Sequence, residues 1–276
     1  MGARRRASST PLDIDPALRS KAWAVHQRLC AEYGCPIPYF HNLDPLSELV
    51  SSLLSHRTRN ADSGRAFKAL RARFPTWPEV RDAPTADVET AISAVTWPEQ
   101  KAPRIQAILR EITTRRGELS LDFLVQLSVR DARDWLESLG GVGPKTSAAT
   151  LLFSRLRMAA LPVDSHHHRV AQRLALIPAS LDVGPSHAVL EAQLPEGLPA
   201  QTVYDNHEVL MLHGQHCCFY RDPACARCVV FDLCPTGQAR HPELIGTVGR
   251  PPTTSSELPN GNPLAPSSRS SSRESA

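Results

Sequence analysis

The sequence predicts an all-α fold, and three observations support this class. Apolar residues recur at the spacing of one helical face, for example at Ala132, Trp135, Leu136 and Leu139. Residues that start helices, above all Asp followed by Pro, stand directly before such segments. No segment alternates apolar and polar residues in the way that a half-buried strand does. A chain of 276 residues has room for one large domain or two small ones with a substantial core.

The first two helices are predicted from their start and stop signals. Asp15-Pro16 opens a helix that continues to about Tyr33, where Gly34 is a plausible stop. Asp44-Pro45 opens the next helix, with Asp as N-cap and Pro at the first position. Because its body, residues 46–54, is strongly apolar, we expect this helix at the centre of the core.

Further helices follow along the chain. Asn60 can cap a helix that ends near Phe74. A long helix begins after Trp97-Pro98 and ends at about Arg116. Shorter helical segments are expected near 77–82, 85–94, 131–139, 145–156, 169–177, 186–194 and 199–214.

A glycine turn joins two of these helices, in the sequence LGGVGPKT from Leu139 to Thr146. Gly141 and Gly143 are expected to supply positive φ angles that other residues avoid, and Pro144 suits the first turn of the second helix. Backbone N–H groups at such a turn point outward beside the positive end of a helix, which makes the turn a candidate phosphate site. The alternative is a turn between packed helices with a solvated lysine at position 145.

Shortly after the turn stands Val163-Asp164-Ser165-His166, followed by His167, His168 and Arg169. Three adjacent histidines could suggest a metal site, but consecutive helical residues point in different directions and do not converge on one ion. We therefore interpret the segment as the start of a helix, with Asp164 or Ser165 as its N-cap.

Five of the seven cysteines crowd into a short segment near residue 225. A disulfide framework is not expected, given the odd number of cysteines and an expected cytoplasmic location. Zinc is an alternative, although zinc sites usually pair two short Cys knuckles that are well separated, whereas one compact loop with four thiolates suits an iron–sulfur cubane. Cys30 and Cys35 are interpreted as ordinary buried thiols. Four cysteines follow a C-x6-C-x2-C-x5-C spacing: Cys218, Cys225, Cys228 and Cys234.

These motifs resemble those of the endonuclease III family of helix-hairpin-helix DNA glycosylases. In that family a G-V-G-x-K-T turn grips the DNA backbone, its lysine is the nucleophile, and an aspartate in a V-D-[TS]-H segment is the partner of that lysine. The resemblance implies that Lys145 is the nucleophile and that Asp164 is its partner. It also implies DNA contacts through Gly141, Val142 and Gly143.

The cysteine spacing is similar to the loop that holds a [4Fe–4S] cluster in the same family. The resemblance therefore implies a [4Fe–4S] cofactor with Cys218 as the first ligand, while the adjacent Cys217 breaks the spacing. Arg221, between the first two ligands, is predicted to contact DNA, because the basic residue of this loop contacts phosphate in relatives.

Two further loops bear on DNA recognition. The segment containing His56, Arg57 and Arg59 is a polar helix exit on its residues alone; in the family the matching loop inserts a side chain into the duplex, so Arg57 is predicted to contact DNA. Thr96-Trp97-Pro98 departs from the glycine-containing form that is common in the family. This departure leaves the lesion preference open. Trp97 could be a wedge or a core residue, and the core interpretation is favoured.

By the same likeness the fold consists of two helical lobes with a DNA groove between them. One lobe, residues 43–157, is a helical bundle with the hairpin; the other combines residues 18–42 with 158–238 and carries the iron–sulfur loop. Residues 1–17 are predicted to be a disordered basic arm, and residues 246–276, rich in Pro, Ser, Thr and Asn, a disordered tail.

The implied function is base excision repair of double-stranded DNA. The resemblance implies a monomeric DNA glycosylase with AP lyase activity, which removes damaged bases, expected to be oxidised pyrimidines, and acts on abasic sites by Schiff-base chemistry and β-elimination. The alternatives are a non-catalytic iron–sulfur DNA-binding protein, a monofunctional or mismatch glycosylase, and a zinc-stapled DNA-binding module.

Charge and hydropathy set bounds on this interpretation. The formal net charge is only +3, so attraction to DNA must come from a local basic face. No apolar run approaches the ~18 residues that suggest a membrane span, and no apolar segment follows the basic N-terminal residues as in a secretory signal. We therefore expect a cytoplasmic, DNA-associated protein without membrane contact.

Overall fold

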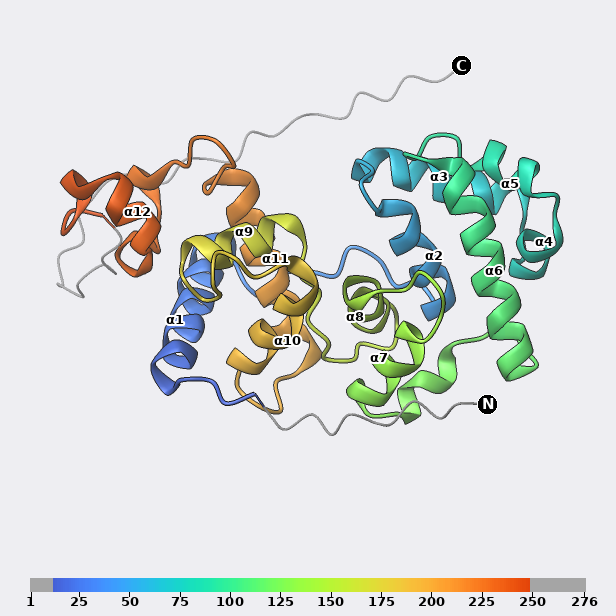
Figure 1. Cartoon of the computed structure of the whole chain (residues 1–276), viewed down its shortest axis with the longest axis horizontal. Helices are drawn as coiled ribbons and strands as arrows, with labels where there is room; N and C mark the ends of the chain where they lie inside the picture. Colours follow the sequence, from blue (N-terminus) through green and yellow to red (C-terminus); the bar gives the residue numbers. More distant parts are fainter. Residues whose placement is uncertain (1–11, 249–276) are drawn as a thin grey trace, which may run out of the picture.

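The computed structural model describes residues 12–248, and over this range it contains helices and no strand, which confirms the predicted all-α class (Figure 1). None of the described helices is long and apolar enough to cross a membrane. Within residues 12–248, short 3-10 helices lie at 122–126, 225–227, 231–233 and 242–244. The α-helices are α1 (Pro16–Tyr33), α2 (Pro45–Ser55), α3 (Asn60–Arg73), α4 (Trp77–Asp82), α5 (Thr85–Ala91), α6 (Pro98–Arg116), α7 (Val129–Glu137), α8 (Pro144–Phe153), α9 (Ser165–Arg173), α10 (Val183–Gln193), α11 (Ala200–His216) and α12 (Pro235–Arg240).

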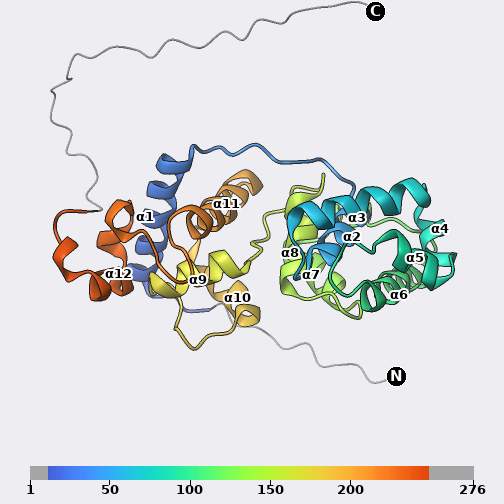
Figure 2. The same ribbon diagram turned by 90° about the horizontal axis from the view of Figure 1, so that it is seen from above.

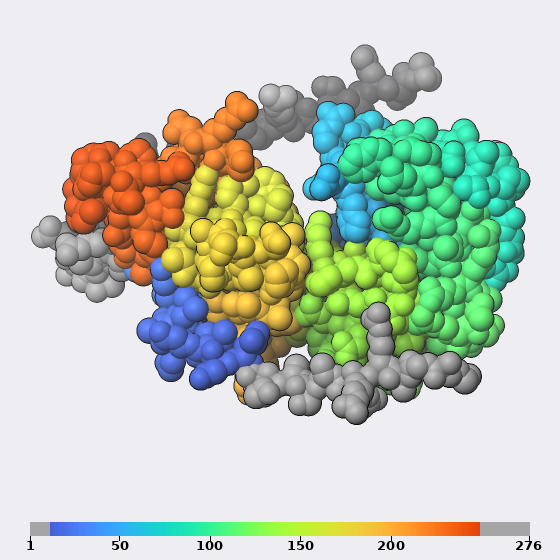
Figure 3. All heavy atoms as spheres, in the orientation of Figure 1, coloured from blue at the N-terminus to red at the C-terminus, as the bar shows by residue number. Residues whose placement is uncertain are grey.

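The helices form two lobes, each around its own hydrophobic core, which Figures 1 and 2 show side by side. One core is built from α2 to α8, and the other from α1, α9, α10, α11 and the cysteine-rich segment. Helix α8 serves both, because its neighbouring residues Leu151 and Leu152 belong to different cores. Between the lobes the surface is hollowed into a cleft (Figure 3).

Helix α2 is the centre of the first lobe, as its apolar sequence predicts. The Asp44 carboxylate caps it by accepting the backbone N–H groups of Leu46 and Ser47, each at 3.0 Å. Leu49 and Leu54 are fully buried. Burying such a side chain stabilises a fold by about 1.5–3 kcal/mol relative to leaving it exposed.

The chain crosses between the lobes twice, before α2 and after α8, and Arg157 ties the two crossings together. Its guanidinium donates to the carbonyl oxygens of Phe153, at 2.7 Å, and of His41, at 2.8 Å. It also lies 3.4 Å from the centre of the Tyr39 ring. Arg157 adopts a positive φ of 48°, a conformation that persists only where surrounding contacts fix it.

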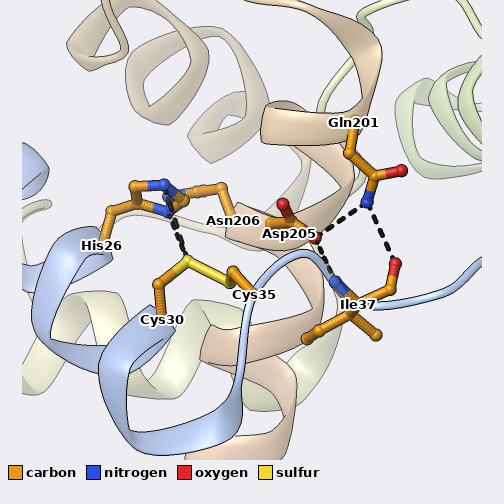
Figure 4. The surroundings of a disulfide bond; sticks show 7 residues. All are labelled: His26, Cys30, Cys35, Ile37, Gln201, Asp205 and Asn206. Atoms are coloured by element: carbon orange, nitrogen blue, oxygen red, sulfur yellow. Dashed lines mark hydrogen bonds between the residues drawn. A yellow bond between two sulfur atoms is a disulfide. The ribbon is translucent and has the colours of Figure 1, made fainter.

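Cys30 and Cys35 form a disulfide bond at the end of α1, so their interpretation as free thiols is wrong (Figure 4). The left-handed turn at Gly34, with φ 82°, brings the two residues to a Cα–Cα separation of 4.9 Å. The segment that follows is fixed to the second lobe, since the Asp205 carboxylate accepts the backbone N–H of Ile37 at 2.8 Å.

Several predicted boundaries need correction. Helix α1 begins at Pro16, so the predicted arm of residues 1–17 cannot extend into it; residues 1–11 lie outside the described range. Asn60 is the first residue of α3 rather than its cap, and Arg59 at the cap position makes no side-chain cap bond. Most of the predicted tail, from residue 249 on, also lies outside the described residues, and the short helix α12 was not expected.

Candidate active site

The glycine turn joins α7 to α8 as the sequence predicts, but its two central glycines differ. Gly141 has a φ of 92°, and a Cβ added there would lie 2.8 Å from Cδ of Arg104 on α6. Gly143 instead has an extended backbone, with φ −109° and ψ 179°, and space around it. The expectation of positive φ is therefore confirmed at Gly141 and wrong at Gly143.

The turn exposes backbone donors at the start of α8. Among the described residues, the backbone N–H groups of Gly143, Lys145 and Thr146 meet no acceptor; the next one, of Ser147, donates to the Gly143 carbonyl at 3.0 Å. Val142 packs into the core with 6% of its surface exposed, so the turn presents Val142 to a ligand through its backbone. Free N–H groups beside the positive end of a helix form a site for a phosphate group.

Asp164 is the N-cap of α9, and its carboxylate accepts the backbone N–H of His167 at 2.7 Å. Burial acts to raise the pKa of Asp164, but the charges of His207, His167 and His166 and the His167 N–H outweigh it, so the pKa is lowered. At neutral pH the rings of His167 and His207 are themselves neutral, since burial lowers both of their pKa values. The hydrogen bond from the His167 backbone N–H therefore stabilises the ionised Asp164 carboxylate at neutral pH.

The charges of Lys145 and Asp164 both affect the pKa of the buried His207. His207 belongs to α11 and is 4% exposed. Its Nδ1 lies 2.8 Å from the Pro162 carbonyl oxygen. Burial lowers the pKa of His207, the Asp164 carboxylate acts to raise it, and the Lys145 ammonium lowers it further. Both charged groups thus act on one imidazole, although Lys145 and Asp164 stand on different helices.

A second buried histidine positions the segment that carries Asp164. Nε2 of His187, on α10, accepts the backbone N–H of Val163 at 3.0 Å, and its Nδ1 lies 2.9 Å from the Val183 carbonyl oxygen. Burial and the charges of Arg133 and Lys145 outweigh two backbone hydrogen bonds and lower the pKa of His187 to about 4. The ring is therefore neutral at physiological pH, with Nε2 as an acceptor and Nδ1 as a donor.

Sequence patterns did not reveal His187 or His207, because no motif marks them. The only signal was their polarity within otherwise apolar helix faces, which is also compatible with a role in packing. The three histidines after Asp164 do not converge, as expected: His166 contacts Arg169, His167 is buried, and His168 contacts the Leu181 carbonyl.

Arg57 and Trp97 lie together on the surface of the first lobe. Trp97 is 44% exposed, so its interpretation as a core residue is wrong. The Arg57 guanidinium carbon lies 5.8 Å from the centre of the Trp97 ring, within the range of a cation–π contact. Arg221 is exposed on the cysteine-rich segment of the other lobe.

The cysteines of the predicted C-x6-C-x2-C-x5-C pattern line one pocket. Within that pocket an Arg173 N–H donates to Sγ of Cys218 at 3.2 Å, and the Gly237 N–H donates to Sγ of Cys234 at 3.3 Å. Such donors stabilise thiolates, so the chemistry of the pocket fits a thiolate-ligated group. Cys217 lines the same pocket and, with His213 and Cys228, places its ligand atom within 4.8 Å of theirs.

Comparison with known proteins places the chain in a family. The model of the HhH-GPD superfamily base excision DNA repair protein matches residues 50–199. Endonuclease III of Thermotoga maritima is 30% identical over 191 residues, 69% of this chain and 83% of that protein. Endonuclease III of Escherichia coli K12 is 29% identical over 217 residues, 78% of this chain and 95% of that protein.

A third relative is covered less completely. A protein of Arabidopsis thaliana, provisionally named a DNA glycosylase, is 35% identical over 172 residues, or 62% of this chain, and the match spans 57% of that relative's length.

Solved structures share the fold. A non-covalent complex of endonuclease III with DNA superimposes with a TM-score of 0.67 at 20% identity, covering 81% of this chain and 98% of that one. A thermostable thymine-DNA glycosylase gives a TM-score of 0.67 at 19% identity, with 81% and 99% covered. The family match includes the glycine turn, Lys145 and Asp164. The chain therefore belongs to the HhH-GPD superfamily of base excision DNA repair proteins, within the endonuclease III family of DNA glycosylases.

Proposed function

We propose that the protein is a bifunctional DNA glycosylase and AP lyase that removes oxidised pyrimidines from duplex DNA. The observation that carries this proposal is the pair formed by Lys145, beside the unpaired backbone N–H groups at the start of α8, and the Asp164 carboxylate at the N-cap of α9. An amine and a carboxylate at a common site are the two groups that Schiff-base removal of a base requires.

The chemistry assigns one role to each group. The unprotonated Lys145 amine attacks C1′ of the damaged nucleotide, the bond from C1′ to the base breaks, and the base leaves with the electron pair. The ionised Asp164 carboxylate stabilises the positive charge that develops on the sugar. Opening of the sugar ring gives the Schiff base, and loss of a C2′ proton then expels the 3′ phosphate by β-elimination.

The surface offers matching contacts to the DNA backbone. The free N–H groups at the start of α8 would bind a phosphate next to Lys145. Arg57 and Trp97 are exposed on the first lobe and Arg221 on the second. A duplex would lie in the cleft between the two lobes (Figure 3). The damaged nucleotide must leave the stack to reach the amine.

The cysteine pocket suits a [4Fe–4S] cluster, for which we propose four ligands. When bound, such a group holds together the chain segments that ligate it. Here those segments include the loop with Arg221 and the entry to α12, so the group would fix a DNA-facing loop. The ligands are Cys218, Cys225, Cys228 and Cys234.

Borohydride trapping tests the proposed reaction. The protein is incubated with a duplex that contains one abasic site or one oxidised pyrimidine, beside a Lys145→Ala variant. We expect a covalent adduct that the variant does not form. If Lys145→Ala retains strand cleavage at an abasic site, Lys145 is not the nucleophile and the proposal fails.

A monofunctional mismatch glycosylase is the second candidate, because the fold also matches a thymine-DNA glycosylase with a TM-score of 0.67. This function predicts base release from a mismatched duplex without a trapped adduct. A protein that binds DNA but releases no base would instead be the non-catalytic iron–sulfur protein.

A further inference from the structure

Arg57 and Trp97 both adopt backbone conformations that residues with a Cβ normally avoid. Their φ angles are 50° and 57°, in the left-handed region. Such a conformation is unfavourable for a residue with a Cβ, so it persists only where its surroundings fix it. The two residues stand on separate loops, one after α2 and one before α6, which meet in the upper part of the first lobe in Figure 1.

The side chain that fixes the first loop is Lys101, near the start of α6. Only 7% of its surface is exposed. Its Nζ donates to the carbonyl oxygen of Leu54 at 2.7 Å, to that of His56 at 2.8 Å, and to Thr58 Oγ1 at 2.9 Å. These three bonds use all three donors of the ammonium group, and they hold the residues on both sides of Arg57.

The same network reaches the second loop. Thr58 Oγ1 also accepts the backbone N–H of Thr96, at 3.1 Å, and Thr96 Oγ1 donates to the Arg57 carbonyl at 3.0 Å. Thr96 is the residue directly before Trp97. The Thr58 hydroxyl that accepts the Thr96 N–H also accepts a hydrogen bond from Lys101 Nζ. The two loops are therefore joined by side-chain bonds that meet around one ammonium group.

We propose that Lys101 is a positioning residue that holds Arg57 and Trp97 as one preformed element, which enters the DNA stack when the damaged nucleotide leaves it. This inference rests on the proposed function, because it assumes that a nucleotide is extruded. An element that is ordered before binding loses little conformational entropy on contact with DNA. The indole ring offers a stacking face and the guanidinium a planar cation beside it.

Lys101 could instead be considered a second nucleophile. Burial, followed by the nearby charge of Arg104, lowers the pKa of Lys101 to about 8, a property shared with reactive lysines. Its three hydrogen bonds argue against that role, because an attacking amine needs a free lone pair. Its three acceptors all belong to the end of α2 and the loop that follows it.

The test compares Lys101→Met with Lys68→Met, a substitution of the exposed lysine on α3 of the same lobe. Single-turnover cleavage is measured on a duplex with one thymine glycol and on a single-stranded oligonucleotide with one abasic site, where no stack needs to open. We expect Lys101→Met to slow the duplex reaction at least about tenfold, since a base must be unstacked before it reacts. The single-stranded reaction should change less than about twofold, a change of under 0.5 kcal/mol.

Two results would overturn the proposal: an equal loss on both substrates, which indicates a general structural or nucleophilic role, and an unchanged duplex rate. Thr58→Val is a milder variant, because it removes the shared acceptor but leaves Lys101 bonded to its two carbonyl oxygens. Thr58→Ser keeps the hydroxyl and should restore the duplex rate. In an Arg57→Ala/Trp97→Ala background, Lys101→Met should add little further loss, because all three residues act through one element.

A readout without chemistry separates this inference from the proposed reaction. A 2-aminopurine placed next to the lesion becomes fluorescent when it is unstacked, and we expect binding of the unsubstituted protein to raise the signal and Lys101→Met to reduce that rise. A protein that unstacks the base but forms no borohydride adduct would contradict the lyase reaction and still support the role of Lys101. An equal rise with both proteins would contradict the role of Lys101 alone.

Discussion

His56 Nε2 lies 2.9 Å from Thr146 Oγ1, and this contact joins the loop after α2 to the helix turn that carries Lys145. Burial lowers the pKa of His56 to about 4, and the charges of Lys145, Lys101 and Arg104 act in the same direction. The imidazole is therefore neutral at physiological pH, and it can share a hydrogen bond with the hydroxyl without placing a second positive charge beside the amine.

Thr146→Val should impair the reaction by removing this contact. A net hydrogen bond is worth about 0.5–1.5 kcal/mol, so we expect AP lyase rates to fall by up to about tenfold. Thr146→Ser keeps a hydroxyl and should retain most of the rate. Single-turnover cleavage of an abasic-site duplex by the two variants checks this prediction, and equal rates would show that the contact does not position Lys145.

The two glycines of the turn should respond differently to alanine. Gly141→Ala places a Cβ 2.8 Å from the Arg104 side chain at a φ of 92°, so we expect the free energy of unfolding to fall by about 1–2 kcal/mol. Gly143→Ala adds its Cβ in open space at an ordinary φ, so its loss should be under about 1 kcal/mol. Urea denaturation of both variants checks the difference, and equal losses would contradict the assigned geometry.

Local signals in the sequence predicted the fold well. Asp44 and Pro45 start α2 as expected, because a capping side chain and a fixed φ act within one helical turn. The glycine turn was also identified from its residues, and Gly141 does adopt the positive φ. Such features depend on neighbours along the chain, which a single sequence displays directly.

The errors concern contacts between distant segments. The sequence favours a core position for Trp97 because aromatic residues are often buried, but its exposure is set by how the loops before α3 and α6 meet. The prediction of buried thiols at Cys30 and Cys35 is wrong, because their pairing depends on the left-handed turn at Gly34. The role of His187 likewise depends on α10 packing behind Val163, which no local motif encodes.

Replacement of Asp164 by Asn and by Ala should separate the structural role of this side chain from its chemical role. Asn can still accept the His167 N–H, so Asp164→Asn should lose at most a few tenths of a kcal/mol of stability. Asp164→Ala should lose about 1 kcal/mol. Both remove the carboxylate, so both should slow base release by at least about 100-fold if it stabilises charge on the sugar. Base release by Asp164→Asn at the full rate would contradict the assigned role, and thermal unfolding provides the stability comparison.

Stability should decrease in mild acid because of buried histidines such as His187. The pKa of His187 is lowered to about 4 in the fold, whereas an unfolded histidine titrates near ~6.5. Between these values the unfolded chain binds the proton and the folded chain does not, so stability falls as pH falls. From pH 7 to pH 5 this one group accounts for a loss of about 2 kcal/mol at most.

His187→Gln keeps an acceptor for the Val163 N–H but does not titrate. The variant should therefore lose less stability than the unsubstituted protein between pH 7 and pH 5, by up to the same ~2 kcal/mol. Urea denaturation at both pH values measures the two losses. Parallel losses in the two proteins would show that His187 is not protonated in this range on unfolding.

Substitution of the two adjacent cysteines should identify the first ligand of the iron–sulfur group. Both line the pocket, but Cys218 is the one that fits the C-x6-C-x2-C-x5-C spacing, and its sulfur accepts a hydrogen bond from Arg173 at 3.2 Å. The Cys217 thiol instead donates to the Ala224 carbonyl at 3.6 Å.

We therefore expect Cys218→Ser to lose most of its iron and the absorption at about 400 nm that thiolate-bound clusters show, whereas Cys217→Ser should keep both. The reverse result would assign the ligand to Cys217, whose sulfur lies within 4.8 Å of the ligand atoms of His213 and Cys228. Zinc in place of iron in the purified protein would contradict the cluster itself, because the spacing would then hold a mononuclear site.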